Sequence, residues 1–277
     1  MEAKRKNKLT KEEMTGRIEA LAQKRRTKEV IQLPICFDDK RATPNSFIRS
    51  ALFSAVQAKD RVFLNGIDIE SQDGITVNFK GEQLNQDDLT LWMALIHLTK
   101  GKPLGSAVTL SAHSILKAMD LSTGGDQHKQ LHEGIRRLNG GSVQITHLKK
   151  KYIGTLIKEA FQDEETGHYA IVLNPNLIQL FGDTQWTAVD WQQRLVLRRK
   201  PLAQALHAYF SSHKNPFPVT LEFLRKLTGS RNTQPASFKR QCRVALENLV
   251  AIGFLQDFGF QGNNVIVQRA MQQLEAG

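Results

Sequence analysis

The feature that most constrains the fold is an internal repeat with a constant offset of 111 residues, which places Val108-Thr109-Leu110 on Val219-Thr220-Leu221. The same offset relates the apolar positions of two helical patterns. These are Leu91, Leu95, Leu98, Leu131, Ile135 and Leu138, which fall on Leu202, Leu206, Tyr209, Cys242, Leu246 and Leu249. One offset that satisfies two helices and the strand between them indicates one supersecondary unit used twice.

Each copy is predicted to contain a helix, a short strand, two further helices and a β-hairpin. In the first copy, Asn85 or Asp87 caps a helix that ends near Leu98, and Ser111 caps the second helix. The other first-copy elements are a strand at 107–110, a helix from Gly124-Gly125 to Asn139, and a hairpin of 143–148 with 152–161. The second copy comprises 201–213, 217–220, 221–228, 235–251 and 254–267. An additional hairpin is predicted upstream from 62–64 and 75–79, which alternate with period two.

This order of elements predicts an α+β protein with two tandem winged-helix (helix-turn-helix) domains. The length of 277 residues fits two domains of ordinary size. We assign 1–43 to a flexible basic tail and linker, 44–182 to the first winged-helix domain and 183–277 to the second. In this fold the third helix of each domain enters the DNA major groove.

The charge balance favours a polyanionic partner. The chain has 38 Lys and Arg against 27 Asp and Glu, a net charge of +11 and a sequence pI near 9.7. Residues 1–31 contribute about +5 of this charge. This composition indicates either a solvated arm or a segment that attracts phosphates non-specifically. No apolar run approaches the roughly 18 residues of a membrane span. Two cysteines, Cys36 and Cys242, predict neither a disulfide framework nor a zinc site, and a reducing cytoplasm is expected.

The third helix of each copy presents polar, mostly cationic residues opposite its apolar stripe, which in the second copy is Cys242, Ala245, Leu246, Leu249 and Val250. The candidate groove-facing residues are Gln127, His128, Lys129, His132, Arg136, Arg137, Lys239, Arg240 and Arg243. Arg and Lys can reach guanine O6 and N7, and Gln can pair with adenine. The alternative is that these charges only solvate the outer faces of surface helices.

A second group of polar residues lies at helix starts and in a turn, where backbone phosphates are often bound. These candidate phosphate contacts are Thr123, Arg231, Asn232 and Ser237, together with Lys149 and Lys150 in a Lys-rich turn that is predicted to be a wing. A merely solvated turn is the alternative for the lysines.

Motifs for catalysis are absent from the sequence. It contains no Walker A pattern, and no His-x-His pair that could accompany a nucleophilic tyrosine in DNA nicking. His128 and His132 are four residues apart, but no third metal ligand is evident nearby. We therefore expect no enzymatic activity, no metal and no cofactor.

Two segments resemble the TrfA-type plasmid replication initiator family: Pro44 to Phe53, which reads PNSFIRSALF, and Tyr209 to Pro218. The likeness covers roughly residues 30–270. It implies two winged-helix domains that bind directly repeated iterons in double-stranded origin DNA, open the origin, and recruit host DnaA and the replicative helicase. It also implies a bacterial cytoplasmic protein associated with the nucleoid or plasmid, and self-association between monomer and dimer.

The resemblance also gives a role to the apolar segment Gln32-Leu33-Pro34-Ile35-Cys36-Phe37. It is similar to the linear motif with which family members bind the host β sliding clamp. Gln32 would hydrogen-bond at the clamp pocket, and Leu33, Ile35 and Phe37 would fill it. Pro34 and Cys36 depart from the common Gln-Leu-Ser-Leu-Phe form of the motif.

A transcriptional repressor built on the same winged-helix module is the alternative function. A repressor needs neither origin opening nor helicase loading, so these two activities separate the hypotheses.

Overall fold

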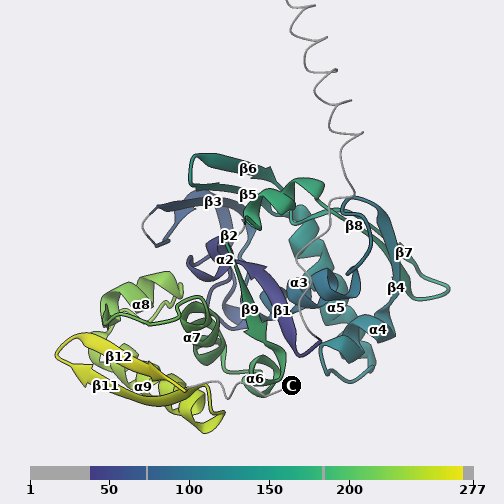
Figure 1. Ribbon diagram of the computed structural model, residues 1–277. Helices are drawn as coiled ribbons and strands as arrows, with labels where there is room; N and C mark the ends of the chain where they lie inside the picture. Colours follow the sequence, from purple (N-terminus) through teal and green to yellow (C-terminus); the bar gives the residue numbers. More distant parts are fainter. Residues whose placement is uncertain (1–37, 73, 183–184, 271–277) are drawn as a thin grey trace, which may run out of the picture. The chain divides into compact units, whose positions relative to one another are not determined.

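The computed structural model describes residues 38–72, 74–182 and 185–270. These residues form a mixed α+β fold, as predicted (Figure 1). Their buried apolar side chains form two hydrophobic clusters: the first extends from Ala42 to Trp191 and includes Ala208, and the second extends from Leu197 to Val267. None of the described helices has the length and apolar character needed to cross a membrane.

The first copy of the repeat contains α3 (Gln86–Leu98), β4 (Ala107–Ser111), α4 (Ala112–Ala118) and α5 (Gly125–Gly140). Its hairpin, β7 (Ile157–Asp163) and β8 (His168–Leu173), pairs with β4 in the order β4-β8-β7. Local capping explains where the helices begin. The Asn85 side chain accepts hydrogen bonds from two backbone N–H groups while Asp88 accepts from the Asn85 N–H, and Ser111 caps α4.

The second copy has the same order of elements. It contains α7 (Pro201–Ser211), β10 (Val219–Thr220), α8 (Leu221–Leu227), α9 (Pro235–Ala251), β11 (Leu255–Gln261) and β12 (Asn264–Arg269). Its sheet has the equivalent order β10-β12-β11. Proline stands in the first turn of α7 and of α9, where its missing N–H costs nothing, and Thr220 caps α8. The element order predicted from the repeat is confirmed in the second copy and, in the first copy, for the three helices and the short strand.

A four-stranded antiparallel sheet is added to the first copy. Its order is β2-β3-β5-β6, with β2 at Phe63–Ile69, β3 at Ile75–Glu82, β5 at Ser142–His147 and β6 at Lys150–Gly154. The hairpin predicted from 62–64 and 75–79 is confirmed as β2–β3, in which Phe63 and Leu64 pair with Glu82 and Gly81.

The prediction of one hairpin from 143–148 and 152–161 was only partly right. Its first part is the β5–β6 hairpin, but the chain from Ile157 onward belongs to β7 and pairs with β8. The reason is burial: the inward residues of β5 and β6 pack with those of β3 in the first cluster. Residues 142–154 are therefore an insertion, and the hairpin equivalent to β11–β12 is β7–β8.

A two-stranded sheet joins segments that are far apart in the sequence. Strand β1 (Lys40–Pro44) pairs with β9 (Trp186–Asp190), and Val189 and Trp191 belong to the first cluster. The structure thus places 40–43 in a strand although the sequence assigned them to a flexible linker. It also places β9 with the first cluster although the predicted boundary lay at residue 183. The remaining short elements are α2 (Asn45–Ile48), η1 (Ala58–Asp60), η2 (Pro175–Leu180) and α6 (Trp191–Val196).

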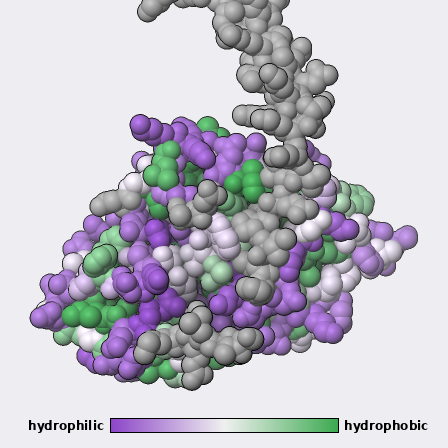
Figure 2. Space-filling view, viewed as in Figure 1, coloured by the Kyte–Doolittle hydropathy of each residue, from purple (hydrophilic) through white to green (hydrophobic). Residues whose placement is uncertain are grey.

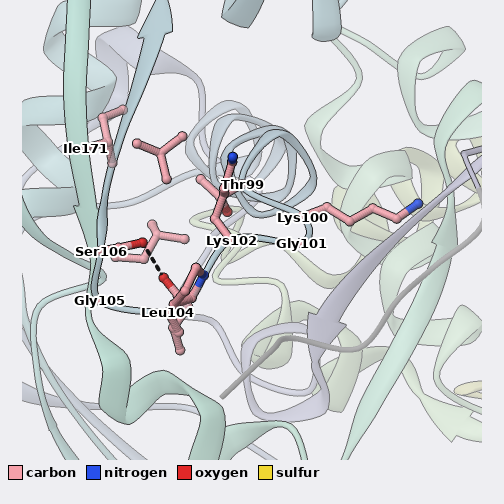
Figure 3. A pocket seen from close by; sticks show the side chains of 11 residues that line it. Thr99, Lys100, Gly101, Lys102, Leu104, Gly105, Ser106 and Ile171 are labelled. Carbon is pink, nitrogen blue, oxygen red and sulfur yellow. Dashed lines mark hydrogen bonds between the residues drawn. The ribbon is translucent and has the colours of Figure 1, made fainter. Parts of the chain in front are cut away.

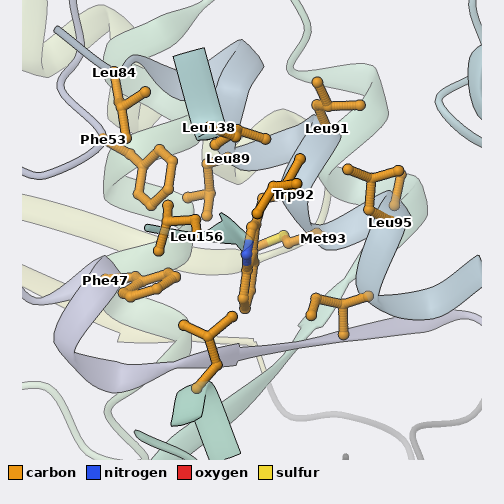
Figure 4. Packing of buried hydrophobic residues seen from close by; sticks show 14 of the residues in the cluster. Phe47, Phe53, Leu84, Leu89, Leu91, Trp92, Met93, Leu95, Leu138 and Leu156 are labelled. Carbon is orange, nitrogen blue, oxygen red and sulfur yellow. The ribbon is translucent and has the colours of Figure 1, made fainter. Parts of the chain in front are cut away.

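Aromatic packing around α3 forms the centre of the first cluster (Figure 4). The Trp92 ring meets Phe47 edge-on with 4.9 Å between ring centroids, and it stacks on Phe181 at 6.2 Å. Phe47 follows β1 and Phe181 precedes β9. Residues near both ends of the segment that forms the first cluster, here called the first half, therefore pack on the same tryptophan. Such edge-to-face and stacked pairs are favoured by the ring quadrupoles.

Polar contacts join the first half to the segment that forms the second cluster, here called the second half. Arg194 is fully buried, and its guanidinium donates to Thr90 Oγ1 (3.0 Å) and to the Gln86 carbonyl (2.8 Å) on α3. Burial lowers the pKa of Arg194 to about 10, which still leaves it charged at neutral pH. Arg49 donates to Ser212 Oγ (2.9 Å), and the Ala55 N–H donates to the Thr228 carbonyl (2.6 Å). These contacts link α6 and the ends of α7 and α8 to the first half.

Candidate nucleic-acid interface

Helix α9 packs against α7, α8 and β11 through one apolar side. Its buried residues are Phe238, Cys242, Ala245, Leu246 and Leu249. Burial also raises the pKa of the Cys242 thiol to about 12, as expected for a core cysteine. Val250, predicted to belong to the apolar stripe, is instead 36% exposed, and Phe238 takes part in its place. Among the described residues, those on the opposite side of α9 are mostly exposed.

The three cationic residues predicted on α9 lie on or beside this outer side. Arg240 and Arg243 are exposed and Lys239 is half-buried. Two of them lie over the Phe260 ring of β11: the Lys239 Nζ is 5.2 Å and the Arg243 Cζ is 4.9 Å from the ring centroid. Phe260 meets Phe258 edge-on at 6.0 Å. The aromatic strand therefore positions two cations of the helix, an arrangement worth about 0.5 to 1 kcal/mol for each exposed pair.

Sequence reasoning missed Phe258 and Phe260. A signal was present, since Phe258-Gly259-Phe260 places two aromatic rings on one face of a strand. Figure 2 shows a hydrophobic patch over the β11–β12 hairpin on a face that is otherwise mostly hydrophilic.

The loop before α9 is held by its own polar side chains. Asn232 Nδ2 donates to Ser237 Oγ (2.9 Å), and Asn232 Oδ1 accepts from the Gln234 N–H (3.2 Å). Arg231, predicted to contact phosphate, donates to Gln83 Oε1 in the first half (2.7 Å) and is otherwise exposed. The structure thus brings Arg231, Asn232 and Ser237 together at the beginning of α9.

On α5, the residues His128, Lys129 and His132 are exposed, as predicted. The Tyr169 hydroxyl on β8 lies 3.4 Å from His132 Nδ1, so an aromatic residue of the hairpin again approaches the outer side of the helix. Gln127 is half-buried, and Thr123 is exposed just before the helix begins.

Arg137 does not face outward, which corrects the sequence prediction. Its guanidinium donates to Asp88 Oδ1 through Nε (3.0 Å) and Nη2 (2.9 Å), and the two side chains are only 9% and 1% exposed. Asp88 also pairs with Arg61 at 3.2 Å. Arg136 is exposed, but it donates to Glu82 (2.7 Å) and Glu133 (2.8 Å). Arg137 therefore stabilises the fold, and the charge of Arg136 is largely balanced within the protein.

The Lys-rich turn lies on the inserted sheet. Lys149 and Lys150 are exposed at the two-residue turn between β5 and β6, where Leu148 and Lys149 have φ of 47° and 64°. These lysines are not on the hairpin equivalent to β11–β12. That hairpin, β7–β8, instead has an acidic turn at Asp163-Glu164-Glu165, in which Asp163 Oδ1 accepts from the Glu165 and Thr166 N–H groups.

The residues predicted to bind the sliding clamp, Gln32, Leu33, Ile35 and Phe37, lie outside the described residues.

A small pocket at the end of α3 is lined by the loop 99–106 and by Val108, Ile171 and Leu173 (Figure 3). Lys100 and Lys102 are its charged lining residues, and Lys100 also pairs with Asp38 at 3.3 Å. Among the described residues that line it, none is a carboxylate, a histidine or a cysteine. Within the described parts of the chain, no three His, Cys, Asp or Glu side chains are grouped as a metal site.

Comparison with solved structures shows a likeness in fold. The Pi initiator protein in complex with iteron DNA has a TM-score of 0.57 at 12% identity, and the match covers 86% of this chain and 100% of that one. Domains 2 and 3 of RctB have a TM-score of 0.54 at 12% identity, covering 83% and 99%.

Comparison of sequences shows the family. The plasmid replication initiator protein TrfA of Escherichia coli is 25% identical over 227 residues, which are 79% of this chain and 59% of that protein. The chain therefore spans about three fifths of the length of this relative. The family model described as TrfA protein matches residues 18–269. The resemblance noted in the sequence is confirmed: the chain belongs to the TrfA family.

Proposed function

We propose that this protein is a plasmid replication initiator that binds directly repeated iterons in double-stranded origin DNA. The observation that carries this proposal is the outer side of α9, where Lys239, Arg240 and Arg243 gather and Phe260 holds two of the three. Arg and Lys on such a helix can reach guanine O6 and N7 in the major groove. Family membership and the likeness in fold to the DNA-bound Pi initiator support the same function.

The two repeated units would act as tandem winged-helix domains. In each unit a short strand is followed by two helices and then, after the β5–β6 insertion in the first unit, by a hairpin that pairs back onto the short strand. This is the arrangement in which the last helix of a helix-turn-helix lies in the major groove. Helices α5 and α9 are then the two DNA-reading helices, and the hairpins β7–β8 and β11–β12 are the wings.

The two units would contribute unequally to DNA binding. On α5, Arg137 is buried against Asp88 and Arg136 is paired with two glutamates, which leaves Lys129, His128 and His132 as its outward groups. The acidic turn of β7–β8 would be repelled by phosphates. The turn of β11–β12, at Gln261-Gly262-Asn263, carries no charge. We therefore assign most of the affinity and most of the base contacts to the second unit.

Footprinting on the plasmid that encodes the protein tests the proposal, at about 0.15 M salt to suppress non-specific phosphate binding. Protection of a tandem array of direct repeats is expected. One protected palindrome at a promoter would instead favour the repressor. Arg240→Ala and Arg243→Ala should each weaken binding to the repeat about tenfold or more, within the range of one good base contact. Arg17→Ala in the N-terminal segment is the control, and equal small effects of all three changes would contradict the assignment of α9.

Recruitment of host proteins is the second part of the proposal. After binding, the protein would promote opening of the origin and bring in DnaA, the replicative helicase and the β sliding clamp. For the clamp, Gln32 to Phe37 supply the motif. Leu33→Ala combined with Phe37→Ala should abolish capture of the protein on immobilised clamp while iteron binding stays unchanged. Retained capture would remove this segment from the clamp interaction.

The proposed function includes no bond-breaking step. Purified protein with Mg²⁺ should therefore leave supercoiled origin DNA uncut. Nicking by the pure protein would replace the initiator with a DNA-processing enzyme. Self-association between monomer and dimer also belongs to this proposal, and sedimentation with and without iteron DNA would measure it.

A further inference from the structure

Val244 is a large apolar residue in an exposed position on α9. Its side chain is 56% exposed, whereas the core side of the helix is already filled by Phe238, Cys242 and Leu249. With 3.6 residues per turn, Val244 lies one turn after Arg240 and beside Arg243. It therefore belongs to the same outer side as the cations.

The choice of valine at this position is not explained by the helix itself. A β-branched residue loses side-chain freedom in a helix and is a poorer helix former than the alanine or lysine that commonly occupy exposed sites. Single exposed apolar residues are common on protein surfaces, so exposure alone decides nothing. What sets Val244 apart is its place next to Arg240 and Arg243, on a helix face where Ala236 and Ala251, about two turns away on either side, are also exposed and small. These small residues would let the helix enter a groove closely.

We propose that Val244 contacts the 5-methyl group of a thymine in the major groove and so determines specificity at one base pair of the iteron. The methyl group distinguishes an A·T pair from the other pairs in this groove, and proteins recognise it by apolar contact. The stiff side chain of valine holds its own methyl groups in a defined direction, which suits such a contact. This inference rests on the proposed insertion of α9 into the major groove.

The repeat supplies an internal comparison. The residue 111 positions earlier is Glu133 on α5, which accepts a hydrogen bond from Arg136 at 2.8 Å. A carboxylate cannot make an apolar contact with a methyl group. The thymine contact is therefore a property of the second unit, and it makes the two helices read different bases although their backbones have the same order of elements.

The test uses uracil, which lacks the thymine methyl and keeps the same hydrogen-bonding groups. A duplex of one repeat is made with each thymine replaced in turn by deoxyuridine, and binding is measured by fluorescence anisotropy. For the unmodified protein, one replacement should raise Kd about fourfold, which is the contribution of one buried methyl group. Val244→Ala should raise Kd about fourfold on the all-thymine duplex and lose the response to uracil at that position only. Val250→Ala, the same change on the same helix, is the control and should keep the response.

The outcomes separate the two levels of the argument. If the unmodified protein prefers the repeat over a shuffled duplex but no uracil response disappears in Val244→Ala, the thymine contact is wrong and the insertion of α9 stands. If the unmodified protein shows no preference for the repeat, the proposed function fails and the contact fails with it. Disappearance of one uracil response in Val244→Ala, with its retention in Val250→Ala, establishes the contact.

Discussion

The guanidinium of Arg243 lies over the ring of Phe260, with 4.9 Å between its Cζ and the ring centroid. Lys239 approaches the same ring, so one aromatic residue of the hairpin holds two cations of the helix beside it. The contact restricts long side chains that would otherwise lose considerable freedom on binding DNA. In the proposed function, it would also make the hairpin part of the recognition surface even where the hairpin does not touch DNA itself.

Replacement of Phe260 tests this role. Phe260→Leu keeps an apolar side chain but removes the ring, so we expect Kd for the repeat to rise about fivefold, in line with the loss of two exposed cation–ring contacts. Phe260→Tyr keeps the ring and should bind like the unmodified protein. Anisotropy titrations on repeat and shuffled duplexes measure the effect. Equal losses on both duplexes would mean that the ring supports general affinity and not recognition.

Replacement of Arg137 tests whether this residue stabilises the fold or binds DNA. Arg137→Ala removes one partner of the nearly buried Asp88, and Arg61 remains as the other. We expect the free energy of unfolding to fall by about 2 kcal/mol, less than for a buried charge left entirely alone. Arg136→Ala, which breaks more exposed pairs, should cost under about 1 kcal/mol. Urea denaturation measures both, and iteron binding well below the melting temperature should be unchanged for Arg137→Ala.

Replacement of Gly229 tests how tightly the two halves pack against each other. It has φ of +61°, and an added Cβ would lie 2.7 Å from Ser54 Cβ in the first half. Gly253 also has positive φ, at +71°, but nothing lies within 4 Å of an added Cβ. Gly253→Ala should therefore show only the conformational cost of about 1 kcal/mol, and Gly229→Ala should exceed it by a further 1 to 2 kcal/mol, roughly. Thermal and urea unfolding give the comparison, and equal losses would argue against a tight junction.

Because His207 is buried, we predict that the free energy of unfolding depends on pH. Burial, aided by the charges of Arg194 and Arg269, lowers the pKa of His207 to about 3. Above the unfolded pKa of about 6.5 the histidine is neutral in both states and stability is complete. As the pH falls below that value only the unfolded chain takes up the proton, so this group should lower the free energy of unfolding by about 2 kcal/mol at pH 5.

The control for this prediction is His207→Gln, which does not titrate. Between pH 6 and pH 5 its free energy of unfolding should change by about 1.2 kcal/mol less than that of the unmodified protein, because the unfolded histidine takes up most of one proton over this range. The same slope in both proteins would place the pH dependence on other groups.

The parts of the fold that sequence could predict are those set by neighbouring residues. The caps at Asn85, Ser111 and Thr220 and the period of the apolar residues lie within a few positions of the helices they define. The β1–β9 pairing could not be found in this way. The segment Lys40-Arg41-Ala42-Thr43-Pro44 lacks a strand-like apolar pattern, and its strand conformation depends on a partner about 150 residues later.

The same division applies to the candidate interface. Helical periodicity correctly placed His128, Lys129, His132, Arg240 and Arg243 on exposed surfaces. It could not exclude Arg137 from the groove-facing residues, because the carboxylate with which Arg137 pairs lies 49 positions away on another helix. Nor could it separate the inserted β5–β6 hairpin from β7–β8, since the partner of each strand depends on how the whole sheet packs. Long-range pairing thus decided these three differences between prediction and structure, at β1–β9, at Arg137 and at the β5–β6 hairpin.

The polar contacts of Arg194 and Arg49, and the close approach of Gly229 to Ser54, have a consequence for the spacing of bases under the proposed function. Two DNA-reading helices joined in this way would not swivel freely with respect to each other. Each base pair added between the two contacted segments shifts the second by about 3.4 Å along the duplex and turns it by about 35° around the axis. An insertion of about five base pairs would carry the second segment to the opposite side of the DNA. With such a junction, the proposed initiator would measure angular phase along the duplex as well as base identity.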